Sequence, residues 1–114
     1  MNSTRTGKNE ESAAAEYLRQ QGYIVKDQNW RTRWCEIDIV AEKAGTVFFV
    51  EVKYREFTDH GSGLDYITPK KLQQMRFAAE LLIATQKWGG SSELAAIEVT
   101  GNELKITAFI DGYL

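Results

Sequence analysis

The sequence has little cysteine and histidine and no long apolar run. Its 114 residues include one cysteine, Cys35, and one histidine, His60. A single cysteine has no partner for an intrachain disulfide, and these two residues are too few for an ordinary four-ligand zinc site. No apolar stretch approaches the ~20 residues that span a bilayer, and the polar segment 1–9 lacks the apolar core of a secretory signal. We therefore expect a cytoplasmic protein with no membrane partner.

The chain also lacks an excess of basic charge, because 14 Lys and Arg residues face 16 Asp and Glu residues, for a net charge of −2. This balance argues against a protein that coats nucleic acid non-specifically, since such binding depends on many cationic contacts. It leaves a nuclease open, because an acidic site that holds cations lowers the net charge. With 43% hydrophobic and 26% charged residues, the composition is typical of a globular protein. We expect residues 1–114 to form one domain, with residues 1–8 disordered.

Hydrophobic periodicity and turn residues predict the element order α-β-β-β-α-β-β. One helix is expected over 9–21. A second helix is expected from Pro69 to about Trp88, with Thr68 as its N-terminal cap. This order indicates an α/β domain with a mixed central sheet flanked by helices. Strands are expected at 23–25, 36–42, 46–54, 94–99 and 103–110.

Two charged residues interrupt the most apolar of these predicted strands. Glu51 and Lys53 are two positions apart, so their side chains lie on the same face. A charged side chain inside such a strand costs stability unless it is paired or used. The segment Glu51-Val52-Lys53 is therefore the first candidate for a functional site.

The turn between the second and third predicted strands decides whether Asp38 joins this candidate. Alternation places Ile37 and Ile39 on one face of their strand and Asp38 on the other. With a turn of two residues (Ala44-Gly45) or of four, Asp38 faces Glu51 and their Cβ atoms lie about 5 Å apart. A three-residue turn would send Asp38 to the opposite face. The functional interpretation therefore requires an even turn, or a bulge that restores the facing.

Two carboxylates at that spacing suit a divalent cation. They repel each other, and a hard cation such as Mg²⁺ or Mn²⁺ relieves the repulsion, with the Val52 carbonyl as a further ligand. The metal would polarise a phosphoryl oxygen and lower the pKa of bound water, while Lys53 would orient or activate that water or offset phosphate charge. The residues alone leave an alternative open. The charged residues of these strands are equally explained as cross-strand ion pairs, such as Glu36 with Lys53.

The spacing of these residues resembles a known nuclease motif. The pattern begins with Asp38 and continues, after a spacing of a dozen residues, with Glu51-Val52-Lys53 at the end of an apolar strand. It resembles the PD-(D/E)xK motif. The wider pattern is similar to the YraN-like family, small bacterial proteins that resemble Holliday junction resolvases. The matching stretches cover nearly the whole chain: Gly7, Glu11, Ala14, Tyr17-Leu18, Gly22-Tyr23, Asn29-Trp30-Arg31, Glu36-Ile37-Asp38-Ile39, Phe49-Val50-Glu51-Val52-Lys53, Arg55, Lys71 and Ala108-Phe109.

This resemblance implies a restriction-endonuclease-like fold and a metal-dependent nuclease. It implies Asp38, Glu51 and Lys53 as the catalytic core, with Glu11 approaching from the first helix as a metal ligand beside Asp38, Glu51 and Val52. Nucleic acid is then the partner, with structured or branched DNA as the candidate substrate. Resolvase-like enzymes often work as dimers, so a homodimer is also implied.

Two departures from the family pattern stand out. The family usually has glycine before Glu-Ile-Asp, and this chain has Cys35. It also tends to have Arg-Phe-Asp at the start of the late strand, where this chain has Glu93-Leu94-Ala95. The second departure puts a substrate contact or a structural ion pair in doubt. Neither departure touches the metal-binding core.

Aromatic and basic residues provide candidates for nucleic-acid binding. Trp30, Arg31, Arg33 and Trp34 could stack on bases and hold phosphates. Alternatively, one tryptophan packs into the core and the arginines are solvated. The resemblance adds Arg55 to these candidates.

Several charged or reactive residues have a simpler alternative role. Lys70 and Lys71 lie in the first turn of a helix, where the dipole disfavours cations, which suggests a use such as gripping phosphate. Lys70 is equally explained as a solvated lysine, whereas the resemblance favours Lys71. An acid at Glu11 is favoured by the helix dipole alone. We interpret His60 as a mobile surface residue and Cys35 as a packing residue.

Three functions therefore remain in view. We predict a Mg²⁺- or Mn²⁺-dependent nuclease. A nucleic-acid-binding module of the same fold without catalysis is the first alternative. A protein-interaction module with no nucleic-acid role is the second, and it agrees with the acidic balance.

Overall fold

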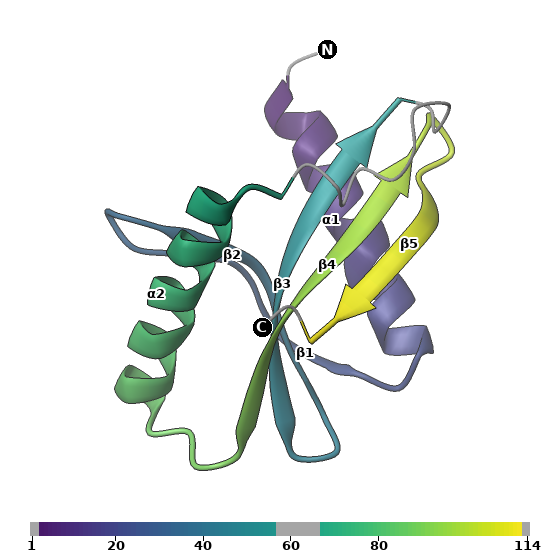
Figure 1. The fold of residues 1–114 in the computed structure, drawn as a ribbon. Coiled ribbons are helices and arrows are strands. Elements are labelled where there is room, and N and C mark those ends of the chain that lie inside the picture. Colours follow the sequence, from purple (N-terminus) through teal and green to yellow (C-terminus); the bar gives the residue numbers. More distant parts are fainter. Residues whose placement is uncertain (1–2, 57–66, 113–114) are drawn as a thin grey trace.

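Five strands lie side by side in their sequence order and form one sheet, with a helix on each face (Figure 1). The computed structural model describes residues 3–56 and 67–112, with side chains from residue 9 onward. The predicted α/β class and element order are confirmed. The helices are α1 (Ser3–Gln20) and α2 (Pro69–Gln86), and the strands are β1 (Ile24–Arg31), β2 (Glu36–Lys43), β3 (Thr46–Arg55), β4 (Ser91–Thr100) and β5 (Lys105–Asp111).

The central pair of strands runs parallel, whereas the other pairs are antiparallel. β3 pairs with β4 from Thr46↔Ser91 to Arg55↔Thr100, and α2 makes the crossover that a parallel connection requires. The pairs β1–β2, β2–β3 and β4–β5 are antiparallel. The sheet is therefore mixed, as predicted, and β1 and β5 form its edges.

A tight turn sets the register of the β2–β3 hairpin. Lys43 pairs with Thr46, so only Ala44 and Gly45 connect the two strands. Both turn residues have positive φ angles, 51° and 81°, as in the type I′ turn that matches the twist of a hairpin. The even turn that the site requires is therefore present.

An apolar layer lies on each face of the sheet. On one face, α1 buries Ala14, Ala15 and Leu18 against strand residues that include Ile39 and Val50. The small alanine side chains let the helix approach the strands closely. The predicted apolar stripe of α2 covers the other face, where Leu72 is partly buried. The fully buried residues of this second layer include Met75, Ala78, Ala79, Leu82, Val40, Val47, Phe49 and Leu94.

Local signals fix both ends of α2. The Thr68 side chain accepts a hydrogen bond from the backbone N–H of Lys71 at 3.1 Å, and Pro69 opens the helix. The helix ends at Gln86, before the predicted end near Trp88, because Lys87 adopts a left-handed φ of 54°. Neither helix in the described ranges has the length and apolar character needed to cross a membrane.

Two predictions near the N-terminus were wrong. α1 begins at Ser3 instead of residue 9, so residues 3–8 are helical rather than disordered. β1 continues to Arg31 instead of ending at Val25. Apolar periodicity missed both segments, because the first turns of α1 are polar and β1 is a mostly exposed edge strand with an irregular register after Val25. His60 lies outside the described residues.

Candidate functional site

The sheet forks where β2 separates from β3. Their pairing runs from Lys43↔Thr46 to Ile39↔Val50. Beyond that point β2 stays with β1 as far as Arg31↔Glu36, and β3 stays with β4. Figure 1 shows the two halves pointing apart beyond the fork.

The fork also breaks the alternation of β2. Ile37 belongs to the core under α2, whereas Ile39 belongs to the core under α1. The prediction that these two isoleucines share a face was therefore wrong. It assumed a straight strand, and β2 bends as it leaves β3.

Asp38 and Glu51 meet at the fork. Each lies one residue beyond the final pair, Ile39↔Val50. Oδ2 of Asp38 accepts a hydrogen bond of 2.8 Å from the backbone N–H of Val52, and the two carboxyl groups are hydrogen-bonded to each other. The prediction that the hairpin brings these two carboxyl groups together is confirmed, while their catalytic role stays a prediction.

Burial is the main cause that raises the pKa of both carboxyl groups. Burial, followed by the negative charge of Asp38, raises the pKa of Glu51 to about 7. Burial also raises the pKa of Asp38, although the Val52 N–H and the hydrogen bond to Glu51 lower it. The hydrogen bond between the two carboxyl groups raises the pKa of Glu51 and lowers that of Asp38. The pair thus holds a proton near neutral pH, in a position where a cation would compensate two charges.

Two lysines face this pair. Nζ of Lys71, from the first turn of α2, lies 3.4 Å from Oε1 of Glu51. Lys53 lies two positions along β3 from Glu51, and its charge also lowers the pKa of Glu51. As for the alternative of cross-strand ion pairs, the contact seen for Glu36 in the described part of the chain is with Arg31 on β1, at 3.7 Å.

Glu11 approaches the pair from α1, on the other face of the sheet. Burial, followed by repulsion from Asp38 and Glu36, raises the pKa of Glu11 to about 7. The charges of Glu11 and Asp38 therefore interact, as the predicted site requires. Among the described residues, however, no three His, Cys, Asp or Glu side chains lie close enough together to hold an ion. The described geometry is a two-carboxylate site with Glu11 beside it.

A second buried carboxylate was missed by the sequence analysis. Glu98 on β4 is 2% exposed, accepts a hydrogen bond of 2.6 Å from Oγ1 of Thr107, and lies 3.6 Å from Nη1 of Arg55. It pairs in register with Lys53. The available signal was the same as for Glu51, an acid that interrupts an apolar strand.

Contact with Glu98 changes the interpretation of Arg55. The Arg55 side chain is only 14% exposed. Its guanidinium group compensates a buried carboxylate. The predicted role of Arg55 in nucleic-acid binding stays a prediction beside this structural role.

Trp30 at the end of β1 and Trp34 in the β1–β2 connection have different environments. Trp30 is partly buried against the core under α2, and its role in nucleic-acid binding stays a prediction. Trp34 is 68% exposed, and the Arg33 guanidinium lies 5.2 Å from its ring centroid. The packing of Trp30 agrees with the alternative in which one tryptophan packs against the core, whereas Trp34 keeps an exposed ring.

A polar hollow lies between the β1–β2 connection and α2. Its volume is about 360 Å³. Cys35 is partly buried there, and its Sγ lies 3.4 Å from Oγ1 of Thr32. Lys71 belongs both to this hollow and to the contact with Glu51. The lining residues are Arg31, Thr32, Cys35, Glu36, Lys71 and Gln74.

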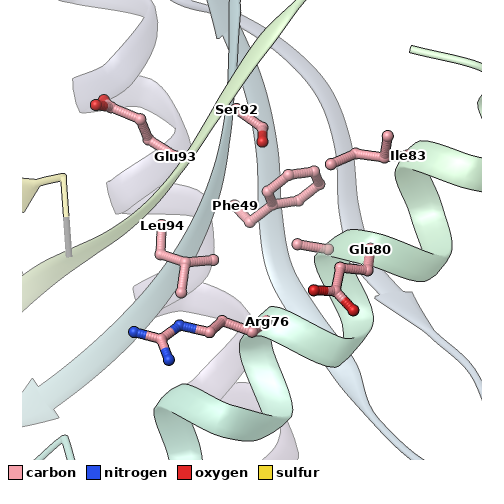
Figure 2. Close-up of a pocket in the computed structure, with 8 residues that line it drawn as sticks. Phe49, Arg76, Glu80, Ile83, Ser92, Glu93 and Leu94 are labelled. Atoms are coloured by element: carbon pink, nitrogen blue, oxygen red, sulfur yellow. The ribbon is translucent and has the colours of Figure 1, made fainter. Parts of the chain in front are cut away.

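A smaller hollow of about 160 Å³ lies between α2 and the first half of β4 (Figure 2). The apolar side chains of Phe49 and Leu94 lie between the two elements, and Arg76 and Glu80 project from α2 beside them. It contains none of the predicted site residues. We therefore place the candidate site at the fork and its adjoining polar hollow.

Sequence comparisons identify related proteins. A sequence model of the uncharacterised protein family UPF0102 matches residues 10–101. A UPF0102 protein of Cytophaga hutchinsonii is 35% identical over 96 residues, covering 84% of this chain and 85% of the relative. A UPF0102 protein of Syntrophomonas wolfei is 36% identical over 106 residues, covering 90% of this chain and 92% of the relative. A UPF0102 protein of Bacteroides fragilis is 42% identical over 77 residues, covering 68% of this chain and 64% of the relative. The matched stretch contains every residue of the fork described above.

Proposed function

The chain belongs to the UPF0102 family, the YraN-like family that its sequence resembles, and on this premise we propose that it is a metal-dependent nuclease. The observation that carries the proposal is the pair Asp38 and Glu51, which shares a hydrogen bond and has raised pKa values at the fork. A divalent cation is the natural replacement for the proton held by such a pair.

The donor set at the fork fits Mg²⁺ or Mn²⁺. Asp38, Glu51 and the Val52 carbonyl would hold the ion, and Glu11 would join them from α1. When bound, such an ion polarises a phosphoryl oxygen and lowers the pKa of its water. All of these donors are oxygen atoms, which are the ligands that both ions prefer.

Lys53 supplies positive charge on the same face as Glu51. Its ammonium would orient the attacking water or offset charge on the phosphate that is cleaved. Glu98, its register partner on β4, is held by Arg55 and Thr107. These contacts compensate the negative charge of Glu98, so that this buried acid next to Lys53 does not repel the phosphate.

The substrate class follows from the groups around the fork. Trp34 and Arg33 present an exposed ring and a cation on the β1–β2 connection, a combination that stacks on bases and contacts phosphates. Arg31 and Lys71 line the polar hollow next to the carboxyl pair. We therefore propose nucleic acid as the substrate, with structured or branched DNA as its first candidate form.

The test is cleavage of labelled single-stranded, duplex, flap and four-way-junction DNA and of RNA, with Mg²⁺ or Mn²⁺. Asp38→Asn and Lys53→Ala should each lower the rate about 100-fold or more. Matched changes at exposed positions of β1, Asp27→Asn and Lys26→Ala, should leave it unchanged. Absence of cleavage by the wild type, or cleavage that survives both site variants with intact folds, would overturn the nuclease.

One observation favours a second candidate, a nucleic-acid-binding module without catalysis. Within the described part of the chain, a third carboxylate does not join Asp38 and Glu51 to complete an ion site, whereas the exposed Trp34 needs no metal to bind a base. This candidate predicts DNA binding that is sensitive to salt, independent of metal and unaccompanied by cleavage.

A further inference from the structure

Lys71 touches two parts of the site at once. Its Nζ lies 3.4 Å from Oε1 of Glu51, and its side chain is 30% exposed, compared with 10% for Glu51. The same side chain lines the polar hollow with Arg31, Thr32 and Gln74. Lys71 therefore stands between the buried carboxyl pair and an open, polar surface.

The position of this lysine is not explained by helix α2 itself. The start of a helix disfavours a positive charge, and the backbone of Lys71 is fixed there by the Thr68 cap. Glu51 compensates the charge. The four-carbon stem of a lysine is flexible, so the ammonium can change partners while the backbone stays in place.

We infer that Lys71 is the counter-ion of the carboxyl pair when no metal is bound, and that a divalent cation displaces its ammonium from Glu51 to a phosphate of a nucleic-acid strand in the polar hollow. This inference rests on the proposed function, because it takes the carboxyl pair as the metal site. Lys71 is in this sense a positioning residue that connects metal binding with substrate binding.

The charges around Glu51 and in the polar hollow support the movement of the Lys71 ammonium from one to the other. A divalent cation held by Glu51 repels an ammonium 3–4 Å away, so Lys71 lowers the affinity of the pair for metal. In the hollow, Glu36 would repel a phosphate, but Arg31 contacts Glu36 at 3.7 Å, and Lys71 adds the positive charge that makes the lining net cationic. Metal and strand should therefore bind with positive coupling.

The first test compares Mn²⁺ binding by calorimetry in wild type, Lys71→Met and Lys70→Met, without nucleic acid. Lys70 is the matched control, because it lies in the same turn, is exposed and carries the same charge. Loss of the competing ammonium should tighten Mn²⁺ binding to Lys71→Met roughly fivefold or more, and Lys70→Met should change it less than about twofold. Equal Mn²⁺ affinities in the two variants would overturn the inference.

The second test measures the anisotropy of a fluorescein-labelled single-stranded oligonucleotide with and without Ca²⁺, a hard cation with the same preference for oxygen ligands. In wild type and Lys70→Met, Ca²⁺ should raise strand affinity. In Lys71→Met that gain should shrink roughly fivefold. An undiminished gain would overturn the transfer of Lys71 to phosphate. Equimolar inorganic phosphate should not displace the oligonucleotide, and displacement would show that the hollow binds a free ion instead of a strand.

These results separate the inference from the proposed function. Tighter Mn²⁺ binding in Lys71→Met supports the counter-ion role even in a protein that does not cleave nucleic acid. If cleavage depends on Asp38 while Lys71→Met and Lys70→Met behave alike, the nuclease stands and the role of Lys71 falls. A wild type that binds no Mn²⁺ overturns both.

Discussion

The backbone N–H of Val52 donates a 2.8 Å hydrogen bond to Oδ2 of Asp38, across the point where β2 leaves β3. A side-chain oxygen therefore takes the place of the backbone carbonyl that would have continued the ladder. This bond satisfies an amide at the fork and fixes the carboxyl group of Asp38 beside Glu51. It also lowers the pKa of Asp38, which burial raises.

The pH dependence of stability should reveal the raised pKa of Glu51. Glu51 has a pKa of about 7 in the folded, metal-free protein and an ordinary value of 4.5. The folded state then binds more protons than the unfolded state between these values, so this group's contribution to the free energy of unfolding falls as pH rises from 4.5 to about 7. In urea titrations, Glu51→Gln should gain stability relative to wild type across that window.

Metal provides the control for this pH effect. If Mn²⁺ binds the ionised pair, as the proposed function requires, adding it should stabilise wild type more at the upper end of the window than at the lower end. Glu51→Gln should show little of this response. A stability difference between wild type and Glu51→Gln that stays constant with pH would contradict the raised pKa of Glu51.

Truncation of Trp34, in the β1–β2 connection, and of Trp30, on β1, should have different effects. Trp34→Ala removes an exposed ring and should weaken oligonucleotide binding by about 1–3 kcal/mol, with a stability change within about 0.5 kcal/mol. Trp30→Ala opens the core under α2 and should lower the free energy of unfolding by about 2–3 kcal/mol. Fluorescence anisotropy and urea unfolding measure the two effects. Nucleic-acid binding that does not change in Trp34→Ala would remove this ring from the proposed surface.

Glu98 should contribute to stability far more than an exposed acid. Glu98→Ala leaves the mostly buried Arg55 without this partner, which should cost about 3–5 kcal/mol. Glu103→Ala is the control, because its contact with Lys105 is 72–79% exposed and should be worth less than about 1 kcal/mol. Comparable losses in the two variants by urea unfolding would show that the buried network is not needed for folding.

The β2–β3 turn offers a stabilising substitution. Ala44 has a φ of 51°, a left-handed conformation that costs most residues about 1–2 kcal/mol and that asparagine tolerates better. Ala44→Asn should raise the melting temperature, and Ala44→Val should lower it because a branched side chain fits this conformation poorly. Mn²⁺ affinity should be the same in both variants, because the register that joins Asp38 to Glu51 is kept. The reverse order of stability would contradict a type I′ turn.

Local sequence patterns predicted much of the fold. The element order, the apolar stripe of α2 and its Thr68-Pro69 start depend on periodicity and capping within a few residues. The polar start of α1 and the exposed strand β1 were missed. A solvent-facing segment needs no apolar alternation, so its sequence carries a weak signal.

The sequence by itself determined the β2–β3 hairpin, but it left the register open between an even and an odd turn. The two-residue turn of the structure selects the register in which Asp38 meets Glu51. Only the tertiary structure decided that β2 and β3 part just beyond these residues, that Lys71 reaches Glu51 and that Arg55 turns inward to Glu98. These contacts join segments far apart in the chain. They depend on strand twist and helix packing, which no local pattern of residues records.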